Sequence, residues 1–355
     1  MKYNTSNLGT GFLYFYIHFV TELICFFVLG RYIESTPVMW LIFFTYDMLA
    51  FVPQAVIGYV SDKFPKICFA LIGLGLLAVA LLLQNCVPYP FLSLILLCIG
   101  NACIHVNGAE VTIRSSNGML SPSSIFVAGG SFGVLSGKLL SGTNLPYWLL
   151  FFLIASAIPF ILLAQTHLND KGDHGINSCK AFKYNNKNVK KQLIIILSVI
   201  VVSVRGYMAY GIPTSWNKTT FQTVLLFVFM GIGKALGGIL ADLFGIRKVA
   251  IMSVIFALPL LMFGDNNMVV SLIGVMFFSM TMSVTLAILV SVLPDTPGLA
   301  FGLTTIGLFL GSVQVFFFKI KDITLNCIML SIMTVICIAC LTISLGRDVT
   351  NERSD

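Results

Sequence analysis

A polar stretch stands at the end of an apolar run, where residues 100–114 read GNACIHVNGAEVTIR. Asn101 and His105 are four residues apart, so a helix places them on one face. A small, polar face is typical of a cavity wall and predicts that His105 handles a ligand or a proton; a packing histidine is the alternative. Glu110 lies about 140° around the helix from His105. We predict that it forms a gating or structural pair with Arg114 at i+4.

The first apolar run carries a histidine and a carboxyl group four residues apart, His18 and Glu22. Both lie near the middle of the run and on one helix face. This spacing predicts a proton-binding pair, and a structural hydrogen bond to a neighbouring helix is the alternative. Asp47 lies at a similar depth in the second run. It is either a proton carrier or half of a static ion pair with Arg205 or a lysine.

Three basic residues also fall inside apolar runs. An ionisable side chain at bilayer depth costs at least about 2.5–3.5 kcal/mol on insertion scales, so it is usually functional or paired. Arg205 lies deep in its run, which predicts an anion-binding group; a neutralising partner for Asp47 or Glu22 is the alternative. Lys234 and Lys138 are further substrate-binding candidates, and Lys138 is close enough to the outer end of its run to reach the interface.

The composition is that of a membrane protein. Hydrophobic residues make up 57% of the chain, charged residues only 10%, and the mean hydropathy is +0.96. Soluble domains carry about 25% charged residues. The runs are apolar over about 20 residues, which favours helices over barrel strands. The sequence therefore predicts an all-α polytopic membrane protein, in which most of the nine cysteines lie inside apolar runs and behave as small hydrophobic groups.

Polar punctuation divides the chain into about twelve transmembrane spans. Their expected limits are 8–30, 38–60, 67–84, 90–113, 122–141, 146–166, 192–212, 219–241, 248–264, 268–292, 298–318 and 323–345. The first run is too long for a removable signal peptide. The only long hydrophilic segment follows the sixth span. We therefore expect an N-terminal six-helix bundle (1–166), a cytoplasmic linker loop (167–191) and a C-terminal six-helix bundle (192–355).

The net charge of +7 follows from membrane topology rather than from a nucleic-acid partner. Basic residues concentrate in the linker and in loops on one predicted side. The opposite loops hold only Arg31, Lys218, Lys319 and Lys321. This asymmetry obeys the positive-inside rule and places both termini in the cytoplasm. We expect a multi-pass monomer in the cytoplasmic (inner) membrane, with no nucleic-acid partner.

An internal repeat supports the division into two halves. GYVSDKFPK at 58–66 and GILADLFGIRK at 238–248 each end an apolar span with Gly, three residues and Asp. Asp62 and Asp242 are therefore equivalent, each after the second span of its half, as in a transporter built from parallel repeats. We expect both to stabilise an outward-open arrangement, through Lys63 or Arg247 and helix ends, rather than to touch substrate.

Glycines repeat at a spacing of four residues in two spans. They are Gly129, Gly133 and Gly137 in the fifth span and Gly307 and Gly311 in the eleventh. Small residues at this spacing let helix backbones approach closely. Such contacts either slide in a rocking transporter or pack statically.

The paired loop motif resembles the signature Gly-x-x-x-Asp-x-x-Gly-Arg-Lys of the major facilitator superfamily. The second copy matches it through Gly238, Asp242, Gly245, Arg247 and Lys248. The first copy has Pro65 where Gly is usual. Within the superfamily, GNACIHVNGAEVTIR followed by SIFVAGGSFGVLSGKLL, HFVTEL in the first span and SVRGYMAYGIPTSW in the seventh resemble the fosmidomycin-resistance-like group. The resemblance implies two six-helix bundles and efflux of a small polar anion, such as a phosphonate.

We expect a proton-coupled secondary active transporter that exports a small organic anion by alternating access. Glu22 and Asp47 would carry protons, while Arg205 with His105 and Lys234 would hold the substrate. A proton-symporting importer of a small metabolite is the alternative, since one fold runs in both directions. No Walker A loop is present, so we expect neither ATP nor another cofactor.

Two other classes of function remain open. In a membrane-embedded enzyme, His18, Glu22 and His105 would bind a metal ion, because imidazole suits zinc or iron. The chain has no H-E-x-x-H motif and no third histidine nearby, so we expect no enzyme and no metal site. A non-transporting sensor or scaffold with the same fold is the remaining alternative.

Overall fold

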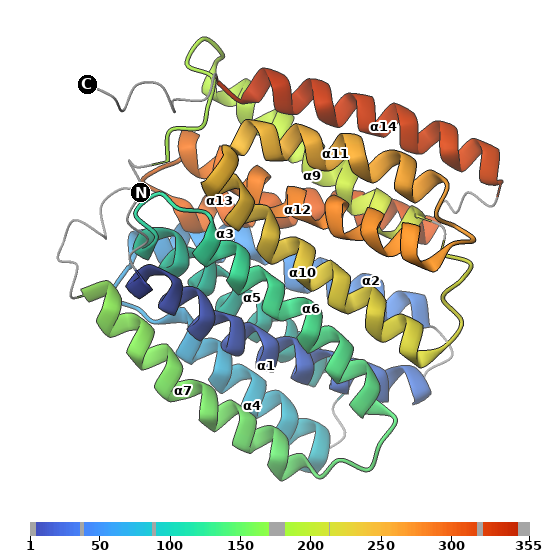
Figure 1. Cartoon of the computed structure of the whole chain (residues 1–355). Helices are drawn as coiled ribbons and strands as arrows, with labels where there is room; N and C mark the ends of the chain where they lie inside the picture. Colours follow the sequence, from blue (N-terminus) through green and yellow to red (C-terminus); the bar gives the residue numbers. More distant parts are fainter. Residues whose placement is uncertain are drawn as a thin grey trace.

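The structure, a computed structural model, is built from helices that run side by side (Figure 1). It describes residues 5–35, 39–86, 90–169, 182–212, 214–317 and 322–346. Across these residues the helices are α1 (Thr5–Ser35), α2 (Met39–Phe51), α3 (Pro53–Lys63), α4 (Phe69–Cys86), α5 (Pro90–Ser115), α6 (Ser121–Ser141), α7 (Tyr147–Asn169), α9 (Lys191–Gly211), α10 (Thr220–Phe244), α11 (Ile246–Met262), α12 (Met268–Val292), α13 (Pro297–Phe317) and α14 (Ile323–Ser344). The predicted all-α class is confirmed.

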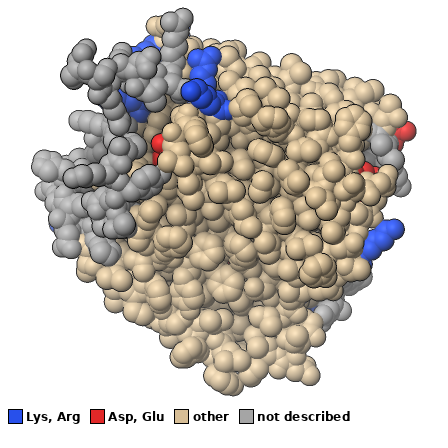
Figure 2. Space-filling model, viewed as in Figure 1, with Lys and Arg blue, Asp and Glu red and all other residues tan. Residues whose placement is uncertain are grey.

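The helices are long and apolar enough to cross a bilayer. In the described ranges, ten helical segments meet this criterion by length and composition. The apolar helices α4 and α11 are shorter, the latter at 17 residues. These two and the ten longer segments agree with the prediction of about twelve spans. Figure 2 shows a broad surface without charged side chains, with Lys, Arg, Asp and Glu confined to its margins. The chain is a multi-pass membrane protein.

The second span differs from the expected single helix over 38–60. It consists of α2 and α3, which meet at Val52, and it continues to Lys63. Val52 itself keeps helical dihedrals (φ −65°, ψ −43°), so Pro53 breaks the helix by lacking a backbone donor and by the clash of its ring with the carbonyl group four residues earlier. Asp62 therefore lies at the end of a short, separate helix.

Glycines of α6 allow it to pack directly on the backbone of α1. A Cβ on Gly129 would fall on the carbonyl oxygen of Phe15, and a Cβ on Gly133 would fall on that of Phe19. In α13, a Cβ on Gly311 would fall on the carbonyl oxygen of Ser203 in α9. The close backbone approach predicted from the four-residue spacing is therefore confirmed.

The α1–α6 contact leads to a stability prediction. Replacing Gly129 with Val is expected to destabilise the protein by about 1–3 kcal/mol, the usual cost of overpacking. Gly75→Val in α4 is the control, because a Cβ there has nothing within 4 Å. Melting temperatures in one detergent measure both variants. A Gly129→Val protein that melts with the wild type would contradict the close contact.

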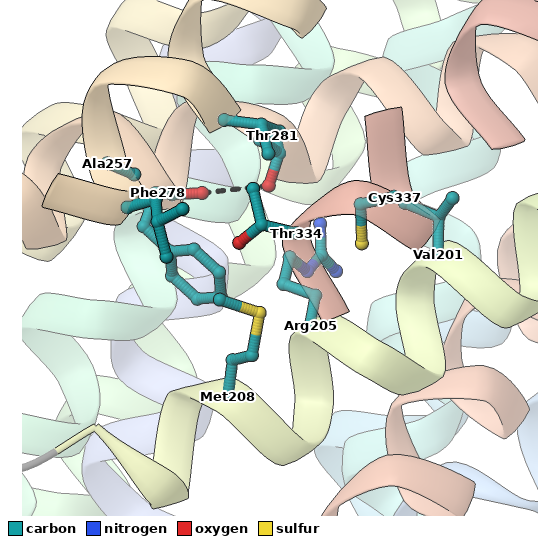
Figure 3. Close-up of a pocket in the computed structure, with 10 residues that line it drawn as sticks. Val201, Arg205, Met208, Ala257, Phe278, Thr281, Thr334 and Cys337 are labelled. Atoms are coloured by element: carbon teal, nitrogen blue, oxygen red, sulfur yellow. Dashed lines mark hydrogen bonds between the residues drawn. The ribbon is translucent and has the colours of Figure 1, made fainter. Parts of the chain in front are cut away.

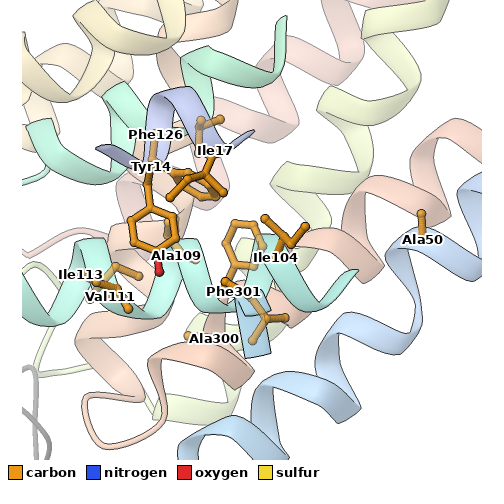
Figure 4. Packing of buried hydrophobic residues seen from close by; sticks show 14 of the residues in the cluster. Tyr14, Ile17, Ala50, Ile104, Ala109, Val111, Ile113, Phe126, Ala300 and Phe301 are labelled. Carbon is orange, nitrogen blue, oxygen red and sulfur yellow. The ribbon is translucent and has the colours of Figure 1, made fainter. Parts of the chain in front are cut away.

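Aromatic rings from three helices join in the buried core (Figure 4). Tyr14 of α1 and Phe126 of α6 pack edge to face, with centroids 6.1 Å apart. Phe301 of α13 lies 6.4 Å from Phe126. Helices from both sides of the linker therefore contribute to one core at this point. The division at 167–191 into two bundles stays a prediction.

The described end of the linker lies against two other parts of the chain. The Tyr184 hydroxyl donates to the Gly118 carbonyl oxygen (2.7 Å), in the loop between α5 and α6. The Asn186 backbone donates to the Ser344 carbonyl oxygen (2.8 Å), at the end of α14. Residues 170–181 of the expected linker lie outside the described residues.

Candidate functional site

Helices α1 and α5 bring together what we call the carboxylate–imidazole cluster, His18, Glu22 and His105. The distance from His105 Nε2 to Glu22 Oε1 is 3.2 Å, and the distance from His18 Nε2 to the same oxygen is 3.8 Å. Asn101 Nδ2 donates to this oxygen at 3.0 Å. All four side chains are buried. The i,i+4 spacing of His18 and Glu22 explains one contact, and the packing of α5 on α1 supplies the others.

The hydrogen bonds of the two imidazoles determine where a proton must lie. His18 Nδ1 lies 2.9 Å from the Phe126 carbonyl oxygen, and His105 Nδ1 lies 2.9 Å from the Asn101 carbonyl oxygen. A carbonyl oxygen only accepts, so each Nδ1 carries hydrogen. Each Nε2 of a neutral ring then presents a lone pair to Glu22. Because two acceptors repel, the 3.2 Å contact between His105 and Glu22 requires a proton on one of them.

Two residues without a recognised sequence signal complete the surroundings of Asn101. Its Nδ2 lies 3.1 Å from the Tyr46 hydroxyl and 3.4 Å from Cys25 Sγ. Its Oδ1 is buried and accepts no hydrogen bond from the described residues. Tyr46 and Cys25 lie in apolar runs, where an aromatic ring and a thiol are ordinary core residues. Only the packing of α2 on α5 identifies Tyr46 as a polar neighbour.

Asp47 is buried in α2 and close enough to Glu22 for their charges to interact. Among the described residues its carboxylate forms no ion pair, so the static pair with Arg205 or a lysine is not present. Two acidic groups thus share this part of the membrane interior. Proton binding by one of them relieves their mutual repulsion.

A second site surrounds Arg205 of α9 (Figure 3). Its cavity, between α9, α11, α12 and α14, has a volume of about 20 Å³, enough for one water molecule. Arg205 Nη1 and Thr334 Oγ1 are buried there, and neither has a hydrogen-bond partner in the described chain. Arg205 makes no ion pair with Glu22 or Asp47. Two unsatisfied polar groups on different helices are therefore available to a ligand. Thr334, one of three threonines in the apolar helix α14, gave no sign of this role in the sequence.

Lys234 of α10 is close enough to both Arg205 and Glu22 for their charges to interact. Lys138 of α6 is elsewhere: its ammonium lies 5.5 Å from the ring centre of Phe26 and 5.1 Å from that of Phe227. These rings attract the cation. The five substrate-binding candidates are therefore not gathered at one place, and their roles stay predictions.

The grouping differs from the expected one for His105 and Asn101. We predicted that both bind substrate together with Arg205. Both instead contact Glu22, and neither lines the Arg205 cavity. The reason is geometric: α5 packs on α1, while the walls of the Arg205 cavity are α9, α11, α12 and α14.

The two repeat-motif aspartates bind helix N-termini across the molecule. Asp62 accepts hydrogen bonds from the backbone of Gly298 (3.0 Å) and Leu299 (2.8 Å), at the start of α13. Asp242 accepts from the backbone of Leu120 and Ser121 (both 2.8 Å) and from the Ser121 hydroxyl, at the start of α6. A carboxylate is stabilised there by unpaired N–H groups and by the helix dipole.

The helix ends were predicted as partners of these aspartates, but the basic partners were wrong. In the described chain, neither Lys63 nor Arg247 forms an ion pair with either aspartate. Arg114 of α5 contacts Asp62 instead, at 3.3 Å from Nη2 to Oδ1. Lys63 follows Asp62 in the helix, so it points to another face, where its ammonium lies 4.5 Å from the Tyr59 ring centre.

Arg114 also makes the predicted contact with Glu110, at 3.0 Å from Nε to Oε1. The Ser61 hydroxyl donates to the other Glu110 oxygen at 2.5 Å. Glu110 and Arg114 are buried, so the network joins the end of α5 to the end of α3. Through Asp62 it also reaches the start of α13.

Glycines make both aspartate contacts possible. A Cβ on Gly58 would fall on the carbonyl oxygen of Gly298, and a Cβ on Gly238 would fall on the side chain of Ser124. The motif glycine of each copy therefore lets its helix approach the helix end that its own aspartate binds. At both points the two helices are in direct contact, so the structure is closed there.

Comparison with known proteins gives relatives of one kind. No family model matches the sequence. The chain is 25% identical over 242 residues to the fosmidomycin resistance protein of Escherichia coli (strain K12), a match that covers 61% of this chain and only 59% of that protein. It is 29% identical over 313 residues to an uncharacterized MFS-type transporter, YfnC, of Bacillus subtilis (strain 168), covering 75% of each.

Solved structures of transporters share the fold. The Escherichia coli fucose:proton symporter FucP superposes with a TM-score of 0.68 at 12% identity, covering 94% of this chain and 97% of that one. The human organic anion transporter MFSD10 (TETRAN) gives a TM-score of 0.69 at 12% identity, covering 96% and 100%. The chain thus has the fold of the major facilitator superfamily and, as its motifs predicted, resembles the transporters of that superfamily, a fosmidomycin resistance protein among them.

Proposed function

We propose that the protein is a secondary transporter that moves a small organic anion by alternating access. The observation that carries this proposal is Arg205, a cation buried in a cavity with its Nη1 unsatisfied. A buried charge without a partner is costly, so an anion that binds there gains the interaction that the protein does not supply. Lys234 adds a second positive charge, close enough to Arg205 for the two charges to interact.

The proposed coupling ion is the proton, carried by Glu22 with His18 and Asp47. The geometry of the carboxylate–imidazole cluster supports this, because the contact between His105 and Glu22 requires a proton. Lys234 interacts with both Glu22 and Arg205, so a change of charge in the cluster affects the energy of an anion beside Arg205. This gives a physical link between the two proposed binding events.

Export is the proposed direction, in accord with the name of the fosmidomycin resistance protein. The fucose:proton symporter has the same fold, so import by symport is the second candidate. We also propose a monomer in the cytoplasmic membrane with cytoplasmic termini, two six-helix bundles and no enzymatic activity. In this arrangement, Asp62 and Asp242 hold the cytoplasmic side closed. They release the starts of α13 and α6 when the transporter opens inward.

Proteoliposomes test the coupling. Glu22→Gln is expected to retain exchange of labelled solute across the membrane but to lose accumulation driven by a pH gradient, because the amide cannot bind the coupling proton. Asp295→Asn, an exposed acid just before α13, is the matched control and should keep both activities. Undiminished pH-driven accumulation by Glu22→Gln would show that Glu22 does not carry the proton. If the wild type exchanged none of a panel of phosphonates, phosphorylated metabolites, carboxylates and organic cations, transport would be contradicted.

A further inference from the structure

We propose that His18, Glu22 and His105 form a binding site for one divalent transition-metal ion, zinc by preference. The ligand atoms of these three residues lie within 4.8 Å of one another, and all three side chains are buried. Two imidazole nitrogens and one carboxylate oxygen suit zinc better than calcium or magnesium, which prefer oxygen ligands alone. The sequence named these three residues as metal ligands only for a membrane-embedded enzyme, a function that we did not expect; the packing of α5 on α1 brings them together without any such function.

The distance between His105 and Glu22 is that of two ligands on a tetrahedral ion, and the distance between His18 and Glu22 is somewhat longer. Zinc bonds of about 2.0–2.1 Å place neighbouring ligand atoms about 3.3 Å apart. The two distances from Glu22 Oε1 are 3.2 Å to His105 Nε2 and 3.8 Å to His18 Nε2. All three ligand atoms lie within 4.8 Å of one another, so rotation of the His18 and Glu22 side chains has to draw them closer before an ion is held at the tetrahedral spacing.

The outer contacts of both histidines are those of metal ligands. A ligating histidine usually donates its other ring N–H to a carboxylate or a backbone carbonyl, which fixes the ring and directs the remaining lone pair at the metal. His18 Nδ1 has the Phe126 carbonyl oxygen, and His105 Nδ1 has the Asn101 carbonyl oxygen, both at 2.9 Å. Both Nε2 atoms are thereby oriented toward the same carboxylate oxygen.

A fourth coordination position is open, as in sites with two His and one Glu. Asn101 lies beside it, because its Nδ2 contacts Glu22 Oε1. The Oδ1 of Asn101 is buried and accepts no hydrogen bond from the described chain. A half-turn of this amide exchanges the nitrogen for the oxygen and offers a further neutral ligand. Otherwise a water molecule fills the position.

The surrounding charges are compatible with a cation. Glu22 supplies one negative charge, and Asp47 is close enough to Glu22 to add a second. Lys234 also interacts with Glu22 and contributes a positive charge. The residues of α6 and α13 described against the cluster are uncharged: a Cβ on Gly130 would fall against His18, and Phe301 stacks on His105 with centroids 6.5 Å apart.

A metal ion and the proposed coupling proton would use the same atoms and would exclude each other. The metal site does not depend on proton coupling, because its ligands are in place whether or not protons drive transport. Zinc binding is therefore measured on purified protein, and transport is measured separately on protein treated with a chelator.

The experiment uses full-length protein without a polyhistidine tag, freed of metal and dialysed at one pH against micromolar zinc. We expect about one zinc ion per chain, bound at least tenfold more weakly in His18→Gln and in His105→Gln. His174→Gln, which removes a histidine from the linker sequence, should bind as the wild type does. Retained binding in the double variant His18→Gln/His105→Gln, or no zinc in the wild type, would overturn the proposal.

X-ray absorption on the zinc-loaded wild type tests the ligands without any variant. The expected first shell contains nitrogen and oxygen at about 2.0–2.1 Å, with the outer scattering of two imidazoles. A sulfur shell at about 2.3 Å would assign the ion to cysteines and contradict the proposed site. If pH-driven transport persists in protein that binds no zinc, only the metal site fails; if zinc binds as expected and no solute is exchanged, only the transport function fails.

Discussion

Replacing Arg205 with Gln is expected to abolish the thermal stabilisation that small anions give the purified protein. Hydrogen bonds to a charged group contribute about 1.5–3 kcal/mol, so anion affinity should fall by about tenfold or more. The unliganded variant is expected to melt no lower than the wild type, because the substitution also removes an uncompensated buried charge. These opposite effects on the free and the liganded protein distinguish a ligand-binding arginine from one that only stabilises the fold.

The measurement is a thermal-shift screen with phosphonates, phosphorylated metabolites, carboxylates and organic cations. Lys191→Gln is the matched control, since it neutralises an exposed residue at the start of the same helix. Arg205→Lys should retain part of the anion effect, because the charge remains while the planar guanidinium is lost. Equal stabilisation of wild type and Arg205→Gln by anions, or stabilisation by cations alone, would contradict the anion site.

The double variant Asp62→Asn/Asp242→Asn is expected to shift the protein from the closed arrangement described here toward one open at the ends of α3 and α13. Asn still offers an acceptor oxygen, so each substitution removes mainly the interaction of the charge with the helix dipole, about 0.3–1 kcal/mol, and the two together change the ratio of closed to open molecules by about 3- to 30-fold. Each single variant should give an intermediate population, since the two contacts are independent.

Spin labels on Lys66→Cys and Asp295→Cys, two exposed positions after α3 and before α13, measure the opening as a distance distribution. The accessible native cysteines are first replaced with serine. Asp322→Asn is the matched control: Asp322 caps its own helix, α14, through the Leu325 backbone at 2.7 Å, so its loss should leave the distance unchanged. An unaltered distance in the double variant would show that the aspartates do not hold the closed state.

The sequence predicted the contacts that depend on one helix and missed most of those that depend on two. Glu110 and Arg114 meet as their spacing requires, and His18 lies beside Glu22 for the same reason. The apolar runs located the spans because lipid demands continuous hydrophobic surface. Pro53 was visible in the sequence as a helix breaker, yet the second span was expected to be one helix.

Contacts between helices required the fold itself. The pairing of Glu22 with His105 depends on how α5 packs on α1, and the selection of Arg114 over Lys63 depends on how α5 lies against α3. Thr334 gave no signal at all, because a threonine in an apolar helix usually bonds to its own backbone. Periodicity gives the face on which a residue lies, but it does not identify the residue opposite.

During synthesis of the chain, each of the two aspartates is made at a different time from the helix start that it binds. A nascent chain that ends at α7 contains Asp62 without the start of α13, and the start of α6 without Asp242. The first half thus carries an aspartate without its backbone donors and a helix start without its acceptor, although Arg114 of the same half already contacts Asp62; the later half supplies both partners. The contacts of Asp62 with α13 and of Asp242 with α6 each join one half to the other. A half inserted alone therefore has unsatisfied hydrogen-bonding groups at these positions. Joining of the halves is favoured before any solute is present.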